Sequence, residues 1–546
     1  MIDGYWIPLL PPFLGGLTLS MILEVLLLPR PIAPWRRPFS AVGVHLGVWT
    51  ILFALELALF RRPYFGAANV LVVQLLIILV SNAKYRTLRE PFVYPDFEYF
   101  IDAIRHPRLY LPFFGALNAL VAGGGYGLAL WAGLALEGSM TAGAGIWLAL
   151  FDQAHPAHMF DPVAPMMPFF LNTSALAALG LILTSYAGRH CRATYDASPD
   201  LHSLGLVAAL WAYGRAERQP VDGLHKLARF ANLQAQRTRP TAAPDLVVIQ
   251  SESFFDARKY YSALKTDVLK NFDLIKAESI QHGNLAVAAW GANTVRTEFS
   301  FLSGMHRKEL GVHQYNPYRF LARHGFPTLA SYLKGLGYRT ICVHPYHRSF
   351  YRRNAVLPQM GFDEFIGIEA FADVVRDGPY VGDRALADKV AQLLPGNVDA
   401  PIYIHVITME NHGPLHWETV SESDKQELLR HPLPDGCDDL VIYARHLRNA
   451  DAMFGMLRST LMARNRPSSL CIYGDHVPIM PAVYKKLGAP AGETDYVLWH
   501  SEAKINVFDR NIKSQSCDVA DLANTFLSAT QLYEKIIKEP LTDSMH

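Results

Sequence analysis

Residues 291–299 read GANTVRTEF, a polar stretch that opens a helix and has a threonine near its centre. Taken alone, Thr294 is most simply a helix cap, because a threonine hydroxyl readily accepts a hydrogen bond from first-turn amides. The other interpretation is that Thr294 is a nucleophile held against a metal ion. Three stretches that lie far from it in the sequence favour this second interpretation.

Each of these stretches is an apolar run, typical of a buried parallel strand, that ends in polar residues. They are LVVIQ at 246–250 followed by Ser251-Glu252-Ser253, IYIHVI at 402–407 followed by Thr408-Met409-Glu410-Asn411-His412, and SLCIY at 469–473 followed by Gly474-Asp475-His476. Ligands in open α/β sheets bind at the carboxyl ends of the strands. We therefore expect Glu252, Asp475 and His476 to meet near Thr294, with oxygen and imidazole groups suited to Mn, Mg or Zn.

Four motifs, SESFFD, GANTVRTEF, MENHGP and GDHVP, occur in an order and spacing that resemble one protein family. This is the lipoteichoic acid synthase and phosphoglycerol transferase group of the alkaline phosphatase/sulfatase superfamily. The likeness covers residues 245–530 and, more loosely, the apolar amino-terminal part. It implies that Glu252, Thr294, Asp475 and His476 are metal ligands and that Thr294 is also the nucleophile.

The same resemblance places substrate-binding residues at His412 and, within SFYRRN, at Arg353 and Tyr351. His412 would contact the phosphate or move a proton, so it is also a catalytic candidate. The sequence departs from the family at two positions: Asn293 stands where a lysine is frequent, and Tyr351 where a tryptophan is frequent. These departures bear on the head group that is bound more than on the chemistry.

The composition indicates a membrane protein. The 546 residues are 51% hydrophobic with a formal net charge of +1, which argues against a nucleic-acid partner and for a lipid one. Spanning a bilayer takes ~20 mostly apolar residues. Five segments are candidate spans: Ile7–Leu28, Ala41–Phe60, Ala67–Val80, Tyr110–Leu136 and Met166–Tyr186. The first is too long and too weakly charged at its start for a cleaved signal peptide, so we expect a retained anchor.

Two ionisable residues, Glu24 and Glu56, lie within these spans. A part in the passage of lipid head groups is conceivable, but a bond to a neighbouring helix is the favoured interpretation. Between the third and fourth spans, residues 84–100 (KYRTLREPFVYPDFEYF) are too polar to cross a bilayer and are expected to form an interfacial helix and loop.

The loop charges and the family resemblance predict opposite sides of the membrane for the carboxy-terminal domain. Lysine and arginine number three, two, five and none in the four successive loops, which puts the carboxy-terminal domain in the cytoplasm if five spans are correct. The resemblance implies the opposite. We follow the resemblance, because a lipid head-group donor and an envelope acceptor require an active site outside the cytoplasmic membrane of a bacterium.

The chain is thus predicted to have a transmembrane domain (1–187), a linker (188–244) and a catalytic domain (245–546). The linker contains an amphipathic helix at Ser203–Arg215. In the catalytic domain strands alternate with helices, which predicts a doubly wound α/β sandwich of the alkaline phosphatase/sulfatase type. Helices are expected at Val268–Ser279, Phe326–Gly335, Asp383–Leu394, Leu440–Arg464 and Val519–Leu532, and strands near 246, 284, 339, 402, 469 and 503.

The five cysteines show no paired spacing, so no disulfide framework is predicted. Cys342 and Cys471 fall in expected strands and are interpreted as core residues. Related phosphoethanolamine transferases tend to have more disulfides, which weakly favours the phosphoglycerol branch. His405 is interpreted as a sheet residue, and His155 and His158 as loop residues.

The resemblance implies an enzyme that transfers phosphoglycerol from phosphatidylglycerol, through phospho-Thr294, to an envelope glycan or polymer. The expected cofactor is a divalent ion, Mn first, with Mg or Zn as alternatives. A phosphoethanolamine transferase of the same superfamily is the first alternative function. A catalytically silent protein that binds lipid or a partner is the second, although the intact set of expected ligands counts against it. A sulfatase would need a cysteine or serine where Thr294 stands. The acceptor and the oligomeric state stay open.

Overall fold

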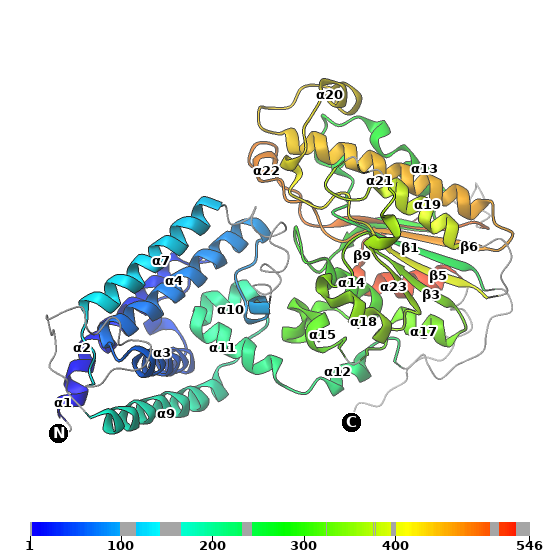
Figure 1. Ribbon diagram of the computed structural model, residues 1–546. Helices are drawn as coiled ribbons and strands as arrows, with labels where there is room; N and C mark the ends of the chain where they lie inside the picture. Colours follow the sequence, from blue (N-terminus) through cyan, green and yellow to red (C-terminus); the bar gives the residue numbers. More distant parts are fainter. Residues whose placement is uncertain are drawn as a thin grey trace. The chain divides into compact units, whose positions relative to one another are not determined.

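The computed structural model describes residues 3–98, 116–141, 165–231, 243–323, 325–374, 376, 378–394, 400–502 and 513–530. The contacts divide the chain into two compact units, Met1–Gln219 and Pro220–His546. Figure 1 shows helices alone in the first unit and a sheet between helices in the second. This is the architecture that the sequence predicts.

Four helical segments of the first unit are long and apolar enough to cross a membrane: Ile7–Leu26, Phe39–Phe60 (α3), Pro63–Leu88 (α4) and Met166–His190 (α9). Ile7–Leu26 contains α2 (Leu10–Leu23) and its flanking 3₁₀ turns. Four of the five predicted spans therefore correspond to long helices. The remaining one overlaps α7 (Ala116–Leu136), and residues 110–115 lie outside the described part.

The third span is longer than its apolar core suggested. Helix α4 begins at Pro63, whose fixed φ suits a first helical position, and ends where Arg89 turns to a left-handed φ of 56°. It thus takes in Lys84 and Arg86, which had been expected in an interfacial helix. The Lys84 ammonium lies 2.7 Å from Glu90 and 2.6 Å from Asp96, so the segment after α4 folds back onto the end of the helix.

The carboxylates inside the spans bind neighbouring segments. Glu24 is fully buried and forms an ion pair with Arg37. Glu56 on α3 accepts a hydrogen bond of 2.9 Å from the Asn69 amide on α4. These contacts agree with the structural interpretation of both residues.

The amphipathic helix expected at Ser203–Arg215 is wrong as a single element. Gly205, with a φ of +80°, separates α10 (Ala197–Leu204) from α11 (Leu206–Glu217). Glycine adopts this conformation without a steric penalty, so it ends one helix and begins the next. Both helices belong to the first unit, whereas α12 (Asp222–Leu227) belongs to the second.

The second unit is built on a nine-stranded sheet in the order β4-β3-β5-β1-β6-β7-β2-β8, with β9 also paired to β2. The strands are β1 (Asp245–Ser251), β2 (Gln281–Ala286), β3 (Arg339–Val343), β4 (Glu364–Ile366), β5 (Ile402–Ile407), β6 (Ser468–Gly474), β7 (Thr494–His500), β8 (Lys513–Ser514) and β9 (Cys517–Asp518). Strands β4, β3, β5, β1 and β6 are parallel, and β7 is antiparallel to both of its neighbours.

Helices cover both faces of this sheet (Figure 1). One face carries α13 (Lys270–Ala277), α19 (Asp383–Leu393) and α21 (Asp438–Met462); the other carries α14 (Thr294–Ser303), α17 (Leu329–Gly335), α18 (Arg353–Gln359) and α23 (Val519–Ala529). Alternate residues of β1 enter the two cores, Val247 and Ile249 on the first face, Leu246 and Val248 on the second. Burial on both faces explains the unbroken apolar run in the sequence.

Most of the predicted elements of this unit are present. The strands expected near 246, 284, 339, 402 and 469 are β1, β2, β3, β5 and β6, and the five expected helices are α13, α17, α19, α21 and α23 with ends shifted by a few residues. Strands β4, β7, β8 and β9 were not predicted. Residue 503 lies outside the described residues, as do His155 and His158. All five cysteines are free, and both Cys342 and Cys471 are buried in strands.

Candidate active site

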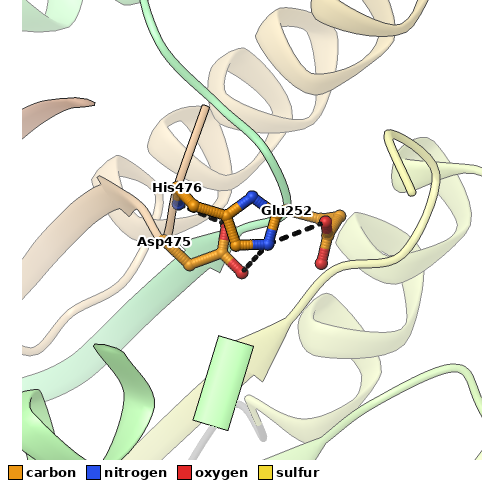
Figure 2. A group of neighbouring side chains, drawn as sticks. All are labelled: Glu252, Asp475 and His476. Atoms are coloured by element: carbon orange, nitrogen blue, oxygen red, sulfur yellow. Dashed lines mark hydrogen bonds and ion pairs between the residues drawn. The ribbon is translucent and has the colours of Figure 1, made fainter. Parts of the chain in front are cut away.

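Glu252, Asp475 and His476 come together at the carboxyl end of two paired strands (Figure 2). Strands β1 and β6 run parallel with Ser251 opposite Gly474, so the residues that follow leave the sheet side by side. A ligand atom from each of the three lies within 4.8 Å of the other two, and all three side chains are buried. This is the meeting point that the strand ends predicted.

Short contacts hold the three side chains in place. The His476 Nε2 atom lies 3.5 Å from Glu252 Oε1 and 3.5 Å from Asp475 Oδ2. Backbone amides of Ser253 and His476 donate to Asp475 Oδ1 at 2.8 and 2.9 Å. The other oxygen, Asp475 Oδ2, is buried and makes no hydrogen bond within the described part of the chain; its ion-pair contact is with His476. A buried carboxylate oxygen without a hydrogen bond is rare in folded proteins, and it fits a site that accommodates a cation.

The electrostatics favour a cation at this position. Burial and the neighbouring Glu252 raise the pKa of Asp475 to about 7. Burial alone would lower the pKa of His476, but Asp475 and Glu252 outweigh it and raise that pKa. Negative charges crowded together without water repel each other, and a divalent ion relieves this repulsion. Two carboxylates and an imidazole therefore fit a divalent metal ion.

Thr294 is the first residue of α14 and sits beside this cluster. Its Oγ1 donates to Glu252 Oε2 at 3.5 Å. The helix cap is Asn293, which has a left-handed φ of 67° and makes no side-chain capping bond. The interpretation of Thr294 as a cap is therefore wrong. Ser253 next to Glu252 also has a positive φ, 53°, and such strained residues concentrate at functional sites.

Arg353, the expected phosphate ligand, is almost completely buried and paired with Glu298. Its Nη2 lies 2.7 Å from Glu298 Oε2, its Nε lies 3.2 Å from Glu298 Oε1, and its Nη1 lies 3.2 Å from His344 Nε2. Burial opposes the charge on Glu298, but Arg353 outweighs this effect and lowers the pKa of Glu298. Two of the five guanidinium N–H bonds are left for another partner.

Two further residues complete the surroundings of Arg353. Tyr351 lies with its ring 5.3 Å from the guanidinium carbon and has a left-handed φ of 52°. His344 has its Nδ1 3.1 Å from the carbonyl of Ile407, at the end of β5. Because Nε2 accepts from Arg353, Nδ1 is the protonated nitrogen, and burial lowers the pKa of His344 well below its usual value.

His412 is half-buried in the loop that follows β5. Its Nδ1 lies 2.7 Å from the carbonyl of Gly413 and 3.3 Å from the hydroxyl of Tyr380. Burial, Tyr346 and Glu252 raise the pKa of Tyr380 above its usual value. Tyr380 thus interacts electrostatically with Glu252, a candidate metal ligand, and also contacts His412.

The structure thus brings Thr294 against Glu252, Asp475 and His476, and it surrounds Arg353 with Glu298, Tyr351 and His344. The roles of these residues stay predictions. Sequence reasoning missed Glu298, Ser253 and Tyr380. Glu298 alone left a signal, since it lies four residues after Thr294 and so on the same face of α14.

Comparison with known proteins agrees with this fold. The sulfatase family model matches residues 244–532, more than half of the chain. The capsular polysaccharide biosynthesis protein RkpI of Rhizobium meliloti is 26% identical over 473 residues, 83% of this chain and 80% of that protein. A putative cyclic β-1,2-glucan modification protein of the same organism is 28% identical over 252 residues, 46% of this chain and 38% of that protein.

One solved structure resembles both units. The integral membrane lipooligosaccharide phosphoethanolamine transferase A of Neisseria meningitidis matches with a TM-score of 0.50 at 13% identity. The match covers 89% of this chain and 87% of that protein. At this identity the likeness shows the fold alone.

Proposed function

Because this chain belongs to the sulfatase family, within the alkaline phosphatase superfamily, we propose that it is a membrane-bound, metal-dependent transferase that moves a phosphoglycerol head group from phosphatidylglycerol to an envelope glycan or polymer. One observation carries the proposal: the Thr294 hydroxyl lies at a buried cluster of two carboxylates and an imidazole, the kind of ligand set that holds a divalent ion. A hydroxyl at a cation site is the arrangement of an activated nucleophile.

Glu252, Asp475 and His476 would hold the ion together with the Thr294 oxygen, Mn being our first choice and Mg or Zn the alternatives. When bound, a divalent ion lowers the pKa of a neighbouring hydroxyl and offsets negative charge on a phosphoryl group. Site residues supply the remainder of the chemistry.

The Thr294 oxygen attacks the donor phosphorus, and the bond from phosphorus to the diacylglycerol oxygen breaks. Diacylglycerol leaves with that electron pair and takes up the proton that the Thr294 hydroxyl loses, while phosphoglycerol stays on Thr294. An acceptor hydroxyl then attacks the same phosphorus, loses its proton to His412 and displaces the Thr294 oxygen, which takes up a proton to restore the hydroxyl. The two remaining N–H bonds of Arg353 bind phosphoryl oxygens, with Tyr351 stacked beside the guanidinium.

The names of the relatives support a glycan acceptor. One is named for capsular polysaccharide biosynthesis and the other for modification of a cyclic glucan. A glycan of the envelope places the catalytic unit on the outer side of the bacterial cytoplasmic membrane, and four long apolar helices would anchor it there. Phosphoethanolamine is the second candidate head group, because the transferase from Neisseria meningitidis shares the fold over both units.

A donor assay tests the proposal. Full-length protein in detergent micelles, loaded with Mn²⁺, is incubated with phosphatidylglycerol or with phosphatidylethanolamine, both with a labelled diacylglycerol part. We expect labelled diacylglycerol from phosphatidylglycerol and none from the Thr294→Ala variant. Release from phosphatidylethanolamine alone would replace the head group in the proposal, and release from neither lipid would end it.

A further inference from the structure

A separate cavity of about 300 Å³ lies beside His412, on the side of the helices α19 and α21. Its wall comes from the segment before and within α19, from the loop after β5, and from α21. The polar and aromatic residues that matter to the argument are Tyr380, Arg384, Asp388, Glu410, Glu418 and His446. None of these residues was singled out by the sequence.

The cavity adjoins the proposed reaction site through shared residues. Tyr380 lines the cavity, and its hydroxyl lies 3.3 Å from His412 Nδ1 and donates to the carbonyl of Gly413 at 3.2 Å. Glu410, on the cavity wall, precedes His412 by two residues in the same loop. A molecule in the cavity therefore contacts Tyr380, whose hydroxyl lies against the histidine that we propose receives the acceptor proton.

A buried polar atom without a partner marks this cavity as a place for a ligand. His446, which is 3% exposed, has its Nε2 3.0 Å from Glu418 Oε1, whereas its Nδ1 is buried and has no hydrogen-bond partner. Folded proteins satisfy nearly all such atoms, so the unsatisfied His446 nitrogen on a cavity wall indicates that a polar ligand completes it.

The charges on the wall disfavour an anionic ligand and suit one rich in hydroxyl groups. Glu418 is already paired with Arg445 at 2.7 Å, and it lies 3.0 Å from His446 Nε2. Glu410 accepts from two neutral donors, the Asn449 amide at 2.5 Å and the Asp383 backbone at 2.6 Å. Asp388 and Arg384 carry opposite charges, and both are exposed on the wall. The wall thus has no excess positive charge for a phosphate, but it has many acceptors for hydroxyl protons.

We propose that this cavity binds one sugar unit of the acceptor glycan and presents its hydroxyl group to His412. The proposal rests on the proposed function and adds the acceptor subsite to it. The volume suits a mono- or disaccharide, Tyr380 and Pro379 offer an apolar face for a sugar ring, and the carboxylates and His446 bind its hydroxyls.

The test fills the cavity without touching the reaction site. Ala385 lines the cavity on α19 and is replaced by leucine (Ala385→Leu); Ala391→Leu on the same helix, outside the cavity, is the matched control. The probe is a fluorescent β-1,2-linked glucose tetrasaccharide, chosen because one relative is named for a β-1,2-glucan. Three quantities are measured with full-length protein: equilibrium binding of the probe, transfer to it, and release of diacylglycerol without it.

We expect Ala385→Leu to weaken probe binding and to raise the KM for the probe at least about fivefold. This corresponds to the loss of one or two hydrogen bonds between the sugar and the wall, because the leucine side chain displaces the sugar. Diacylglycerol release without the probe should stay within about twofold of wild type, and Ala391→Leu should change nothing. Asp388→Asn, an exposed change that leaves the core intact, should act in the same direction.

Unchanged probe binding in Ala385→Leu, or an equal fall in diacylglycerol release, would overturn the proposal, because the cavity would then not serve the acceptor. Failure of the proposed function looks different. In that case wild type releases no diacylglycerol from any donor, while binding of the tetrasaccharide and its loss in Ala385→Leu would still support the sugar site.

Discussion

The oxygen of Thr294 depends on its neighbours for reactivity. A threonine hydroxyl is a poor nucleophile by itself, and Glu252, to which it donates, is the contact that orients it. Ser300 offers a comparison, since it carries a hydroxyl on the same helix that is buried and makes no hydrogen bond. The two residues differ in position relative to the cluster, not in chemistry.

Replacing Thr294 with alanine should abolish transfer and leave the fold intact, because it removes the attacking oxygen and one hydrogen bond of ~1 kcal/mol. The Ser300→Ala control should keep wild-type turnover. Mass spectrometry of acceptor-starved wild type, incubated with phosphatidylglycerol, should find phosphoglycerol on the peptide that contains Thr294. Substantial turnover by Thr294→Ala, or an adduct on Thr297 or Ser300, would assign the nucleophile to another oxygen.

The carboxylates of the cluster should decide how tightly the ion is held. Asp475→Asn or Glu252→Gln removes one negative charge from a buried ligand set, so purified protein should lose most of its bound divalent ion while remaining folded. Elemental analysis of the full-length protein measures this. Glu278→Gln, which changes a carboxylate paired with Arg458, serves as the control and should keep the ion. Metal content equal to wild type in both cluster variants would remove these residues from the site.

At the level of elements, the pair of Glu298 and Arg353 joins α14 to α18. Both side chains are buried, and each would leave an unpaired charge if the other were removed. We expect Glu298→Gln and Arg353→Met each to reduce the free energy of unfolding by roughly 3 kcal/mol or more, and the double variant by clearly less than the sum.

Urea unfolding of the full-length protein in detergent measures these differences. The pair of Glu364 and Arg339, separated by 2.9 Å and half-exposed, gives the matched control, and Glu364→Gln should cost less than about 1 kcal/mol. Additive effects at Glu298 and Arg353 would mean that the two side chains do not stabilise each other.

Strand β5 contains a titratable group inside the sheet. His405 is fully buried, its Nδ1 lies 3.0 Å from the Tyr403 hydroxyl, and burial lowers its pKa to about 4. The unfolded chain binds a proton near pH 6.5, whereas the folded chain does not until about pH 4. Stability is therefore complete above pH 6.5 and falls as the pH drops from 6.5 towards 4, by up to roughly 3 kcal/mol from this residue.

This prediction is checked by unfolding wild type and His405→Gln in urea at several pH values between 7.5 and 4.5. The variant lacks the titrating ring. Its free energy of unfolding should therefore fall less than that of wild type over this range, the difference being the contribution of one proton bound by unfolded His405. Parallel pH profiles for the two proteins would show that His405 does not contribute.

At the scale of the whole molecule, the proposed function depends on the side of the membrane on which the catalytic unit lies. Donor lipid, glycan acceptor and catalytic unit must meet in one compartment. A reporter enzyme that is active only outside the cytoplasmic membrane, fused after His546, should therefore be active, and a reporter that fluoresces only in the cytoplasm should be dark at the same position. The reverse pattern would agree with the loop charges. It would place the catalytic unit in the cytoplasm and so contradict an envelope acceptor.

The two-part architecture and most elements of the sheet are predictable from the sequence, because local patterns encode them. Long apolar runs demand a membrane, and runs such as 246–250 and 469–473 demand strands buried on both faces. The same strands also predicted where Glu252 and Asp475 would lie, since residues that follow paired parallel strands emerge at one edge of the sheet.

Tertiary structure alone decided what depends on contacts between distant segments. The antiparallel strand β7 was invisible because pairing with β6 and β2, not its own pattern, makes it a central strand. The sequence predicted Arg353 as a phosphate ligand but did not predict its burial against Glu298, 55 positions away. The cavity beside His412 is formed by α19, α21 and the loop after β5. Local sequence patterns cannot predict it, because a cavity is the space that packing leaves between distant elements.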